Sequence, residues 1–200
     1  MNTINLKPIW GLLCLFLFYL PFVSAQTIYG TVTNEYDVGL EGVKVSLSCL
    51  SGYTDTTDAS GAFIFENIPA GDLCSIWPFV EGPVFNGVST FDLVLMSKHI
   101  LGVQLLESPY KMIAADVNND GTITQADMID IMEALYGMED EFPNNTSWRF
   151  IPESFIFPDP ANPWVTALPD VLNIGPVTGD VEVNFIAIKI GDVNVSATPD

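Results

Sequence analysis

The stretch Asp116-Val-Asn-Asn-Asp-Gly-Thr-Ile-Thr-Gln-Ala-Asp127 is the most informative motif of this sequence. Oxygen-bearing side chains stand at its first, third, fifth and ninth positions, and a carboxylate stands at its twelfth. A loop with this spacing surrounds a hard cation such as Ca²⁺, which takes about six to eight oxygen ligands at roughly 2.3–2.6 Å. Because the sixth position is glycine, the backbone can make the sharp turn that such a loop needs. The stretch therefore predicts a calcium site.

Each ligand position of this loop has an expected role. The first half supplies side-chain oxygens, the middle supplies a backbone carbonyl and a water-mediated contact, and the last residue supplies both carboxylate oxygens. In that order the metal ligands are Asp116, Asn118, Asp120, Thr122, Thr124 and Asp127. An Asx-rich turn before a helix would not require six positions in register. Mg²⁺ fits less well than Ca²⁺, because it prefers octahedral geometry and keeps its waters.

A helix is predicted directly after the loop, because residues 128–136 carry apolar side chains at helical spacing and Gly137 ends them. An earlier segment, 86–102, has the same form: Asp92 stands 35 residues before Asp127, and glycine again ends the helix. No helix is predicted to enter either loop. The region 81–137 thus contains two loop-helix units in tandem.

These two units resemble a type I dockerin, because each ends its loop in aspartate rather than glutamate. The resemblance covers residues 81–137. It implies a calcium-folded module that binds cohesin-like domains of partner proteins, mostly in extracellular assemblies that degrade polysaccharides. The Ser-Thr pair with which the family recognises cohesin, at loop positions ten and eleven, is here Thr90-Phe91 and Gln125-Ala126.

The loop before Asp92 is incomplete. When Asp92 is matched to the last loop position, Ser89 also matches, but the places of the Asp, Asn and Asp ligands are taken by Glu81, Pro83 and Phe85. The sequence therefore predicts one calcium site and leaves a second site open.

The missing ligands have a candidate source near the other end of the chain. Gly191-Asp192-Val193-Asn194 repeats the Asp-Val-Asn that opens the complete loop. One hypothesis is that this segment folds back and places Asp192 and Asn194 beside Ser89 and Asp92 as a second metal site. The alternative is that it is a fragment of linker.

Residues 26–80 have the alternating pattern of β-strands, with glycine and aspartate clusters between the runs. Four segments stand out: Gly30-Thr-Val, Gly39-Leu-Glu-Gly-Val-Lys-Val, Thr57-Asp-Ala-Ser-Gly-Ala-Phe-Ile-Phe and Ile68-Pro-Ala-Gly. They resemble the carboxypeptidase regulatory-like family and the B-type repeats of surface adhesins. The resemblance implies an immunoglobulin-like β-sandwich that serves as a stalk or spacer and carries no catalytic residues.

The chain is strongly acidic, with 6 Lys and Arg against 25 Asp and Glu and a formal charge of −19. This charge excludes nucleic acid as a partner, disfavours an anionic membrane surface and favours a cation. Residues 1–25 are typical of a secretory signal peptide, since an apolar run from Ile9 to Leu20 precedes small residues. We expect cleavage after Ala25, no membrane insertion afterwards, and a secreted or cell-surface protein.

Export leaves two cysteines, Cys49 and Cys74, in the mature chain. An oxidising compartment favours a disulfide between them, although two buried free thiols also fit the sequence. The single histidine, His99, lies on an apolar helical stretch and is expected to pack rather than to catalyse.

Residues 138–200 are rich in proline and aromatic residues, and they are predicted to form an irregular extension that packs on the dockerin-like region and ends in a strand. Trp148 and Trp164 could stack on sugar rings if exposed, but a tryptophan among prolines more often fills a small core. A catalytic carboxylate pair would have to come from Glu153 and Asp159, which have no supporting motif.

Together these features predict an α+β chain with a signal peptide (1–25), an immunoglobulin-like β-sandwich (26–80), a dockerin-like loop-helix pair (81–137) and an irregular extension (138–200). The function predicted first is a secreted, calcium-binding, non-catalytic interaction module of dockerin type. The alternative is a calcium-stiffened stalk of a surface adhesin, and a carbohydrate-active enzyme component ranks third. The end at Pro199-Asp200 leaves open a longer surface protein.

Overall fold

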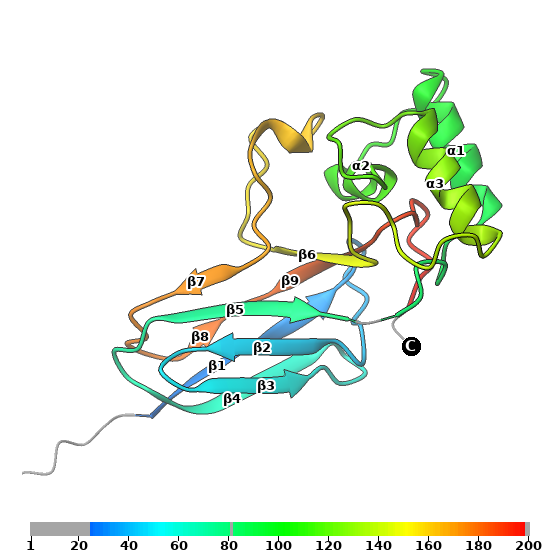
Figure 1. Cartoon of the computed structure of the whole chain (residues 1–200). Helices are drawn as coiled ribbons and strands as arrows, with labels where there is room; N and C mark the ends of the chain where they lie inside the picture. Colours follow the sequence, from blue (N-terminus) through cyan, green and yellow to red (C-terminus); the bar gives the residue numbers. More distant parts are fainter. Residues whose placement is uncertain (1–24, 81, 199–200) are drawn as a thin grey trace, which may run out of the picture.

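The computed structural model describes residues 25–80 and 82–198 of the 200-residue chain. Within this part, strands form two sheets and three α-helices gather beside them, which is an α+β arrangement (Figure 1). The predicted signal peptide, apart from Ala25, lies outside the described residues.

The first sheet joins strands from both ends of the described chain. Its members are β1 (Ala25–Thr33), β4 (Ala62–Pro69), β6 (Trp148–Pro152), β8 (Val181–Glu182) and β9 (Phe185–Lys189). The order is β4-β1-β9-β6, and β8 also pairs with β1. β1 runs antiparallel to β4 but parallel to β8 and β9, and β6 runs antiparallel to β9.

The second sheet is antiparallel throughout. It consists of β2 (Lys44–Ser48), β3 (Gly52–Thr56), β5 (Cys74–Phe79) and β7 (Leu172–Ile174), in the order β3-β2-β5-β7. β1 and β2 alternate buried and exposed positions, as expected for strands with one face toward a core. The inward side chains of both sheets meet in one hydrophobic core, which includes Ile28, Leu47, Phe63, Ile76 and Phe185.

β9 is buried on both faces, which explains why residues 185–190 form a continuous apolar run apart from Lys189. Phe185 and Ala187 belong to the core between the sheets. Ile188 and Ile190 belong to a second core, which lies under the helices. One strand thus supports both halves of the molecule.

The boundaries predicted at 80 and 137 do not separate independent units. Residues 138–200 supply β6, β7, β8 and β9, so this segment completes both sheets in addition to packing on the helices. The prediction of an irregular extension is therefore wrong for these strands. Composition marked the boundaries, but strand pairing between Val32 and Phe185 crosses them.

The helices are α1 (Thr90–Ile100), α2 (Pro109–Ala115) and α3 (Gln125–Leu135), and a short 3-10 turn covers Pro163–Val165. α1 and α3 begin with the same capping box: Ser89 or Thr124 caps the helix, and Asp92 or Asp127 bonds back to the backbone of the cap. Among residues 25–80 and 82–198, none of the helices combines the length and the apolar character that spanning a membrane requires.

The expectation that no helix enters the loops is wrong for the complete loop, because α2 ends at its C-cap residue Asp116. The start of α2 has a signal that the sequence analysis missed. Ser108 caps the helix, and Pro109 stands in its first turn, where a missing N–H group is tolerated.

A disulfide joins Cys49 to Cys74, and so links the end of β2 to the start of β5. Replacing both cysteines by serine is expected to lower the free energy of unfolding by about 3 kcal/mol, because the crosslink restricts the unfolded chain across a separation of 25 residues. Urea unfolding of the variant and the parent measures the difference. A difference below about 0.5 kcal/mol would contradict the prediction.

Candidate metal centre

The complete loop, Asp116–Asp127, lies between α2 and α3, and its last residue organises it. Oδ1 of Asp127 accepts hydrogen bonds from the backbone N–H groups of Val117 (2.8 Å) and Asn118 (3.2 Å). Oδ2 accepts from the N–H group (2.8 Å) and the hydroxyl (3.4 Å) of Thr124. Asp127 thereby ties the start of the loop to the start of α3.

Asp116, at the first loop position, has a buried side chain that the backbone of the loop surrounds. Its Oδ1 accepts from the N–H group of Asp120 (2.9 Å), and its Oδ2 accepts from that of Gly121 (3.0 Å). Burial raises the pKa of Asp116 to about 6; the two hydrogen bonds act against this shift, and the charges of Asp127 and Asp120 add to it. A bound cation would stabilise the ionised form of such a group.

The middle of the loop carries more exposed oxygens. Asn118 Oδ1 accepts from the N–H group of Asp120 (3.1 Å), and Asp120 Oδ1 accepts from the N–H group (2.9 Å) and the hydroxyl (2.6 Å) of Thr122. The hydrogen bond from the Thr122 hydroxyl is the main reason that the pKa of Asp120 is lowered. Asn119 and Gly121 have φ values of +56° and +83°, which let the backbone wind tightly.

The donor set of the complete loop fits Ca²⁺. It combines three carboxylates with amide, hydroxyl and carbonyl oxygens, the ligands that this ion prefers. Neither of the two ion pairs among the described residues includes Asp116 or Asp127, although both are buried. No group of three or more His, Cys, Asp or Glu is gathered at a metal-binding position in the described part, so calcium coordination here would depend on Asn, Thr and backbone oxygens as well.

The same pattern of hydrogen bonds recurs around Asp92, but here the residues come from two segments that lie far apart in the sequence. Asp92 Oδ1 accepts from the N–H groups of Val193 (3.0 Å) and Asn194 (3.2 Å), which stand 101 and 102 residues later. Asp92 Oδ2 accepts from the N–H group (2.8 Å) and the hydroxyl (2.9 Å) of Ser89. The four sequence-predicted residues of the second site are thus brought together, with Asp192 next in the chain to Val193.

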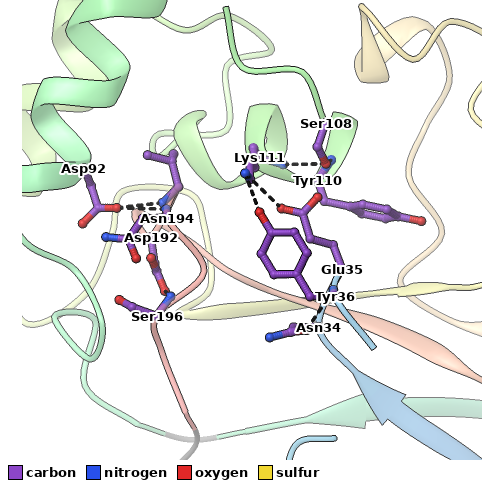
Figure 2. Close-up of polar contacts among 11 residues, drawn as sticks. Asn34, Glu35, Tyr36, Asp92, Ser108, Tyr110, Lys111, Asp192, Asn194 and Ser196 are labelled. Atoms are coloured by element: carbon purple, nitrogen blue, oxygen red, sulfur yellow. Dashed lines mark hydrogen bonds and ion pairs between the residues drawn. The ribbon is translucent and has the colours of Figure 1, made fainter. Parts of the chain in front are cut away.

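Asp192 takes the place that Asp116 has in the complete loop. Its Oδ2 accepts from the N–H groups of Ser196 (2.8 Å) and Ala197 (2.7 Å), four and five residues later. The fourth and fifth successors of Asp116 likewise bond to its carboxylate, but one to each oxygen. Oδ1 of Asp192 is buried and has no hydrogen-bond partner. Figure 2 shows the side chains of Asp92, Asp192 and Asn194 beside one another.

Direct contacts join residues 192–197 to residues 87–92. The Ser196 hydroxyl donates to the carbonyl oxygen of Gly87 (3.1 Å). A Cβ atom on Gly87 would lie 2.4 Å from the Cβ of Ala197, so the segments approach this closely only because residue 87 is glycine. We call residues 192–197 together with 87–92 the split loop. Val195 in it has a φ of +60°, close to that of Asn119 in the complete loop.

Lys189, which the sequence analysis did not single out, fastens the two segments of the split loop. Its buried ammonium group donates to the carbonyl oxygens of Val84 (2.6 Å) and Ile190 (3.2 Å), each a few residues before one segment. Burial lowers the pKa of Lys189 to about 8, against the opposing influence of Asp192. The signal in the sequence was the presence of a single lysine, Lys189, within an otherwise apolar strand.

A polar contact fixes α2 against the first sheet (Figure 2). Lys111 Nζ donates to the Tyr36 hydroxyl (2.7 Å) and lies 3.8 Å from Oε1 of Glu35. Tyr36 and Glu35 belong to the turn that follows β1. Because α2 leads directly into the complete loop, this contact fixes the loop relative to the strands.

The two tryptophans considered for sugar binding differ in position. Trp148 is buried in the core between the sheets and is therefore not available for stacking on a sugar. Trp164 is half-buried beside the complete loop, where a Cβ atom on Gly121 would lie 3.8 Å from its ring.

The other candidates have local structural contacts. His99 is half-buried and accepts the N–H group of Leu106 at Nδ1 (3.0 Å), and burial lowers its pKa. Glu153 Oε2 accepts from the side-chain amide of Asn184 (3.0 Å). Asp159 Oδ1 accepts from a backbone N–H group two residues on (2.9 Å), as in an ordinary turn.

α1 and α3 lie alongside each other (Figure 1) and present apolar side chains to the surface. The exposed side chains on or directly after these helices are Phe91, Val94, Leu101, Ile129 and Tyr136. A groove of about 280 Å³ runs between the helices, lined in part by Ser97, Leu101, Met128 and Ile129. Thr90-Phe91 and Gln125-Ala126 are exposed at the start of the two helices.

This combination of capped helices and acidic loops agrees with a comparison against protein families. Residues 86–135 match the dockerin type I domain. The match supports a dockerin domain in this quarter of the chain. We call residues 86–135 the dockerin segment. It contains α1, α2, α3 and the complete loop, but residues 192–197 of the split loop lie outside it.

Two solved structures are similar to the chain, both of a bacterial adhesin from Mobiluncus mulieris containing intramolecular disulfide, isopeptide and ester bond cross-links. Each is 13% identical; they cover 80% and 82% of this chain, with TM-scores of 0.28 and 0.30. The chain spans only 39% and 41% of the adhesin chains, and TM-scores this low do not establish a common fold. No curated protein matches the chain.

Proposed function

We propose that this chain is a secreted, calcium-binding, non-catalytic interaction module of dockerin type. The observation that carries the proposal is the arrangement of Asp127, whose two carboxylate oxygens hold both ends of the complete loop within the dockerin segment. Dockerins are non-catalytic, and the acidic composition of the chain favours a cation as its ligand. An extracellular setting follows from the signal peptide predicted for residues 1–25.

Calcium bound in the complete loop would act as a structural ligand. Asp116 would contribute a carboxylate oxygen, Asn118 and Asp120 further side-chain oxygens, Thr122 its carbonyl and Thr124 a water-mediated contact. Asp127 would close the loop with its carboxylate. Because calcium would bind the folded loop and not the unfolded chain, the free energy of calcium binding would add to the stability of the fold.

The surface of α1 and α3 is the proposed docking face, and its proposed occupant is a cohesin-like domain of another extracellular protein. Both helices begin at acidic loops, and both expose apolar side chains beside the groove of about 280 Å³. The dockerin match favours a cohesin-type partner. Since Thr90-Phe91 and Gln125-Ala126 replace the family's Ser-Thr pairs, we propose recognition that relies more on apolar contact at these positions.

Replacing Ile129, which is 47% exposed on α3, by glutamate is expected to weaken capture of a cohesin-like partner at least tenfold, because a charge would be buried in the interface. The matched control is Ile156→Glu, since Ile156 is 85% exposed and lies away from these helices in the sequence. The measurement is binding of immobilised cohesin domains from the same source to each variant in calcium. Equal loss in both variants would contradict the proposed face.

The same experiment separates the proposal from its alternative. If calcium binds but no cohesin-like domain is captured by the parent, the calcium-stiffened stalk is favoured. A role in polysaccharide-degrading assemblies is part of the proposal, and it requires that the captured partner belong to such an assembly.

A further inference from the structure

We propose that the split loop is a second divalent-cation site, assembled from two chain segments, and that an ion bound there clasps the C-terminal segment onto the start of α1. The inference rests on the proposed function in one respect: it takes the complete loop as the calcium-binding pattern against which the split loop is compared. The cation it would take is Ca²⁺, because every available donor is a hard oxygen.

The split loop supplies an oxygen at each ligand position. Read in loop order, the donors are the Asp192 carboxylate, the Asn194 amide oxygen, the Ser196 hydroxyl, the Gly87 carbonyl, Ser89 and the Asp92 carboxylate. Ser196 and Gly87 were not among the residues predicted from sequence. They correspond to Asp120 and Thr122, whose side chain and carbonyl have these positions in the complete loop.

Buried carboxylates without a direct ion pair favour an ion in the split loop, although the charge of Lys189 acts on Asp192 from nearby. Asp92 is fully buried and Asp192 is 2% exposed, and neither belongs to an ion pair among the described residues. The nearby ammonium group of Lys189 is bonded to two carbonyl oxygens instead. Two carboxylates held together in a buried place repel each other, and a bound cation would offset this repulsion.

One oxygen atom of the split loop is left without a partner. The hydrogen bonds from Ser196 and Ala197 reach Oδ2 of Asp192, and the buried Oδ1 accepts none. Buried carboxylate oxygens are rarely left unpaired, and an ion is one of the recognised reasons. Oδ1 of Asp192 is therefore the first ligand that we assign to this site.

The split loop should bind more weakly than the complete loop. It offers two carboxylates, Asp92 and Asp192, whereas the complete loop offers three, and the affinity of such loops rises with the number of charged ligands. Its occupancy would have a distinct consequence, because ligands from residues 192–196 and 87–92 would be joined through the ion. The N–H groups of Val193 and Asn194, bonded to Asp92, would then open less often.

The test compares two equivalent substitutions in the full chain, Asp192→Asn in the split loop and Asp116→Asn in the complete loop. Asparagine keeps the shape and an acceptor oxygen but removes the charge. Calorimetric titration with CaCl₂ counts the ions, and amide hydrogen exchange in calcium follows Val193 and Asn194 against Val117 and Asn118. We expect two ions in the parent and one in each variant, with at least tenfold faster exchange only in the loop that carries the substitution.

The outcomes separate the two proposals. If the parent binds one ion that is lost in Asp116→Asn and kept in Asp192→Asn, the split site is overturned and the complete loop stands. If the only ion is lost in Asp192→Asn and kept in Asp116→Asn, the complete loop fails and the split site stands. If the Asp192 variant does not fold, Ser196→Ala decides: Ser196 is exposed, and its loss is expected to weaken the lower-affinity site about tenfold, whereas unchanged binding overturns the assignment.

Discussion

Asp127→Ala is expected to abolish calcium binding by the complete loop and to remove about 4 kcal/mol of stability in 1 mM calcium, if the parent loop binds with a dissociation constant of about 1 μM. Asp127 holds both ends of this loop through four hydrogen bonds and also completes the capping box of α3. Urea unfolding with calcium and with a chelator measures the effect. The loss of stability on adding the chelator should be about 4 kcal/mol smaller in the variant than in the parent.

The control for this prediction is Asp130→Ala. Asp130 lies on α3 one turn beyond the complete loop and is not an expected ligand, so its loss should leave calcium-dependent stabilisation unchanged. The prediction would be contradicted if the parent had the same free energy of unfolding in calcium and in chelator.

A fragment of residues 81–137 is expected to remain largely unfolded on its own, even in millimolar calcium. The core under the helices takes five of its buried side chains from outside this fragment: Phe142, Ile151, Ile188, Ile190 and Val193. Without them Met96, Ile113 and Ile131, all buried in the full chain, would face water. Losing even one buried aliphatic side chain of this size typically costs about 2–5 kcal/mol, and short helices are marginal without packing.

Circular dichroism of the fragment, with the full chain as reference, tests this expectation. We expect little helical signal from the fragment and no cooperative melting. A cooperative transition that appears on adding calcium would show instead that the helices form an autonomous unit, and that the strands serve only to display it.

The turn of the complete loop could be predicted from sequence because its hydrogen-bonding carboxylates, Asp116 and Asp127, lie within twelve consecutive residues; its role as a calcium site stays a prediction. The capping residues Ser89 and Thr124 act over three residues, and so the starts of α1 and α3 could also be predicted from the sequence. The split loop was only indicated by the repeated Asp-Val-Asn, since nothing local to residues 86–92 reveals that Ser196 lies against Gly87.

The domain boundaries could not be predicted for a different reason. Alternation identifies a strand with one buried face, but β9 is buried on both faces and so has no alternating pattern to assign it to either half of the molecule. Likewise the composition around Trp148 shows prolines and aromatics, whereas its place in the core depends on β6 pairing with β9.

The parallel pairing of β1 with β9 determines how the chain would carry tension. β1 enters from the end of the molecule far from the helices, and β9 leaves toward them (Figure 1). A pull between residues 25 and 198 would therefore slide these strands past each other, so that the bonds at Val32 and Thr33 would be loaded together rather than opened one after another. The pull applied at residue 198 would load the hydrogen bonds from residues 193 and 194 to Asp92 before it reaches β9, so the split loop would be the first contact to resist detachment of the C-terminal segment.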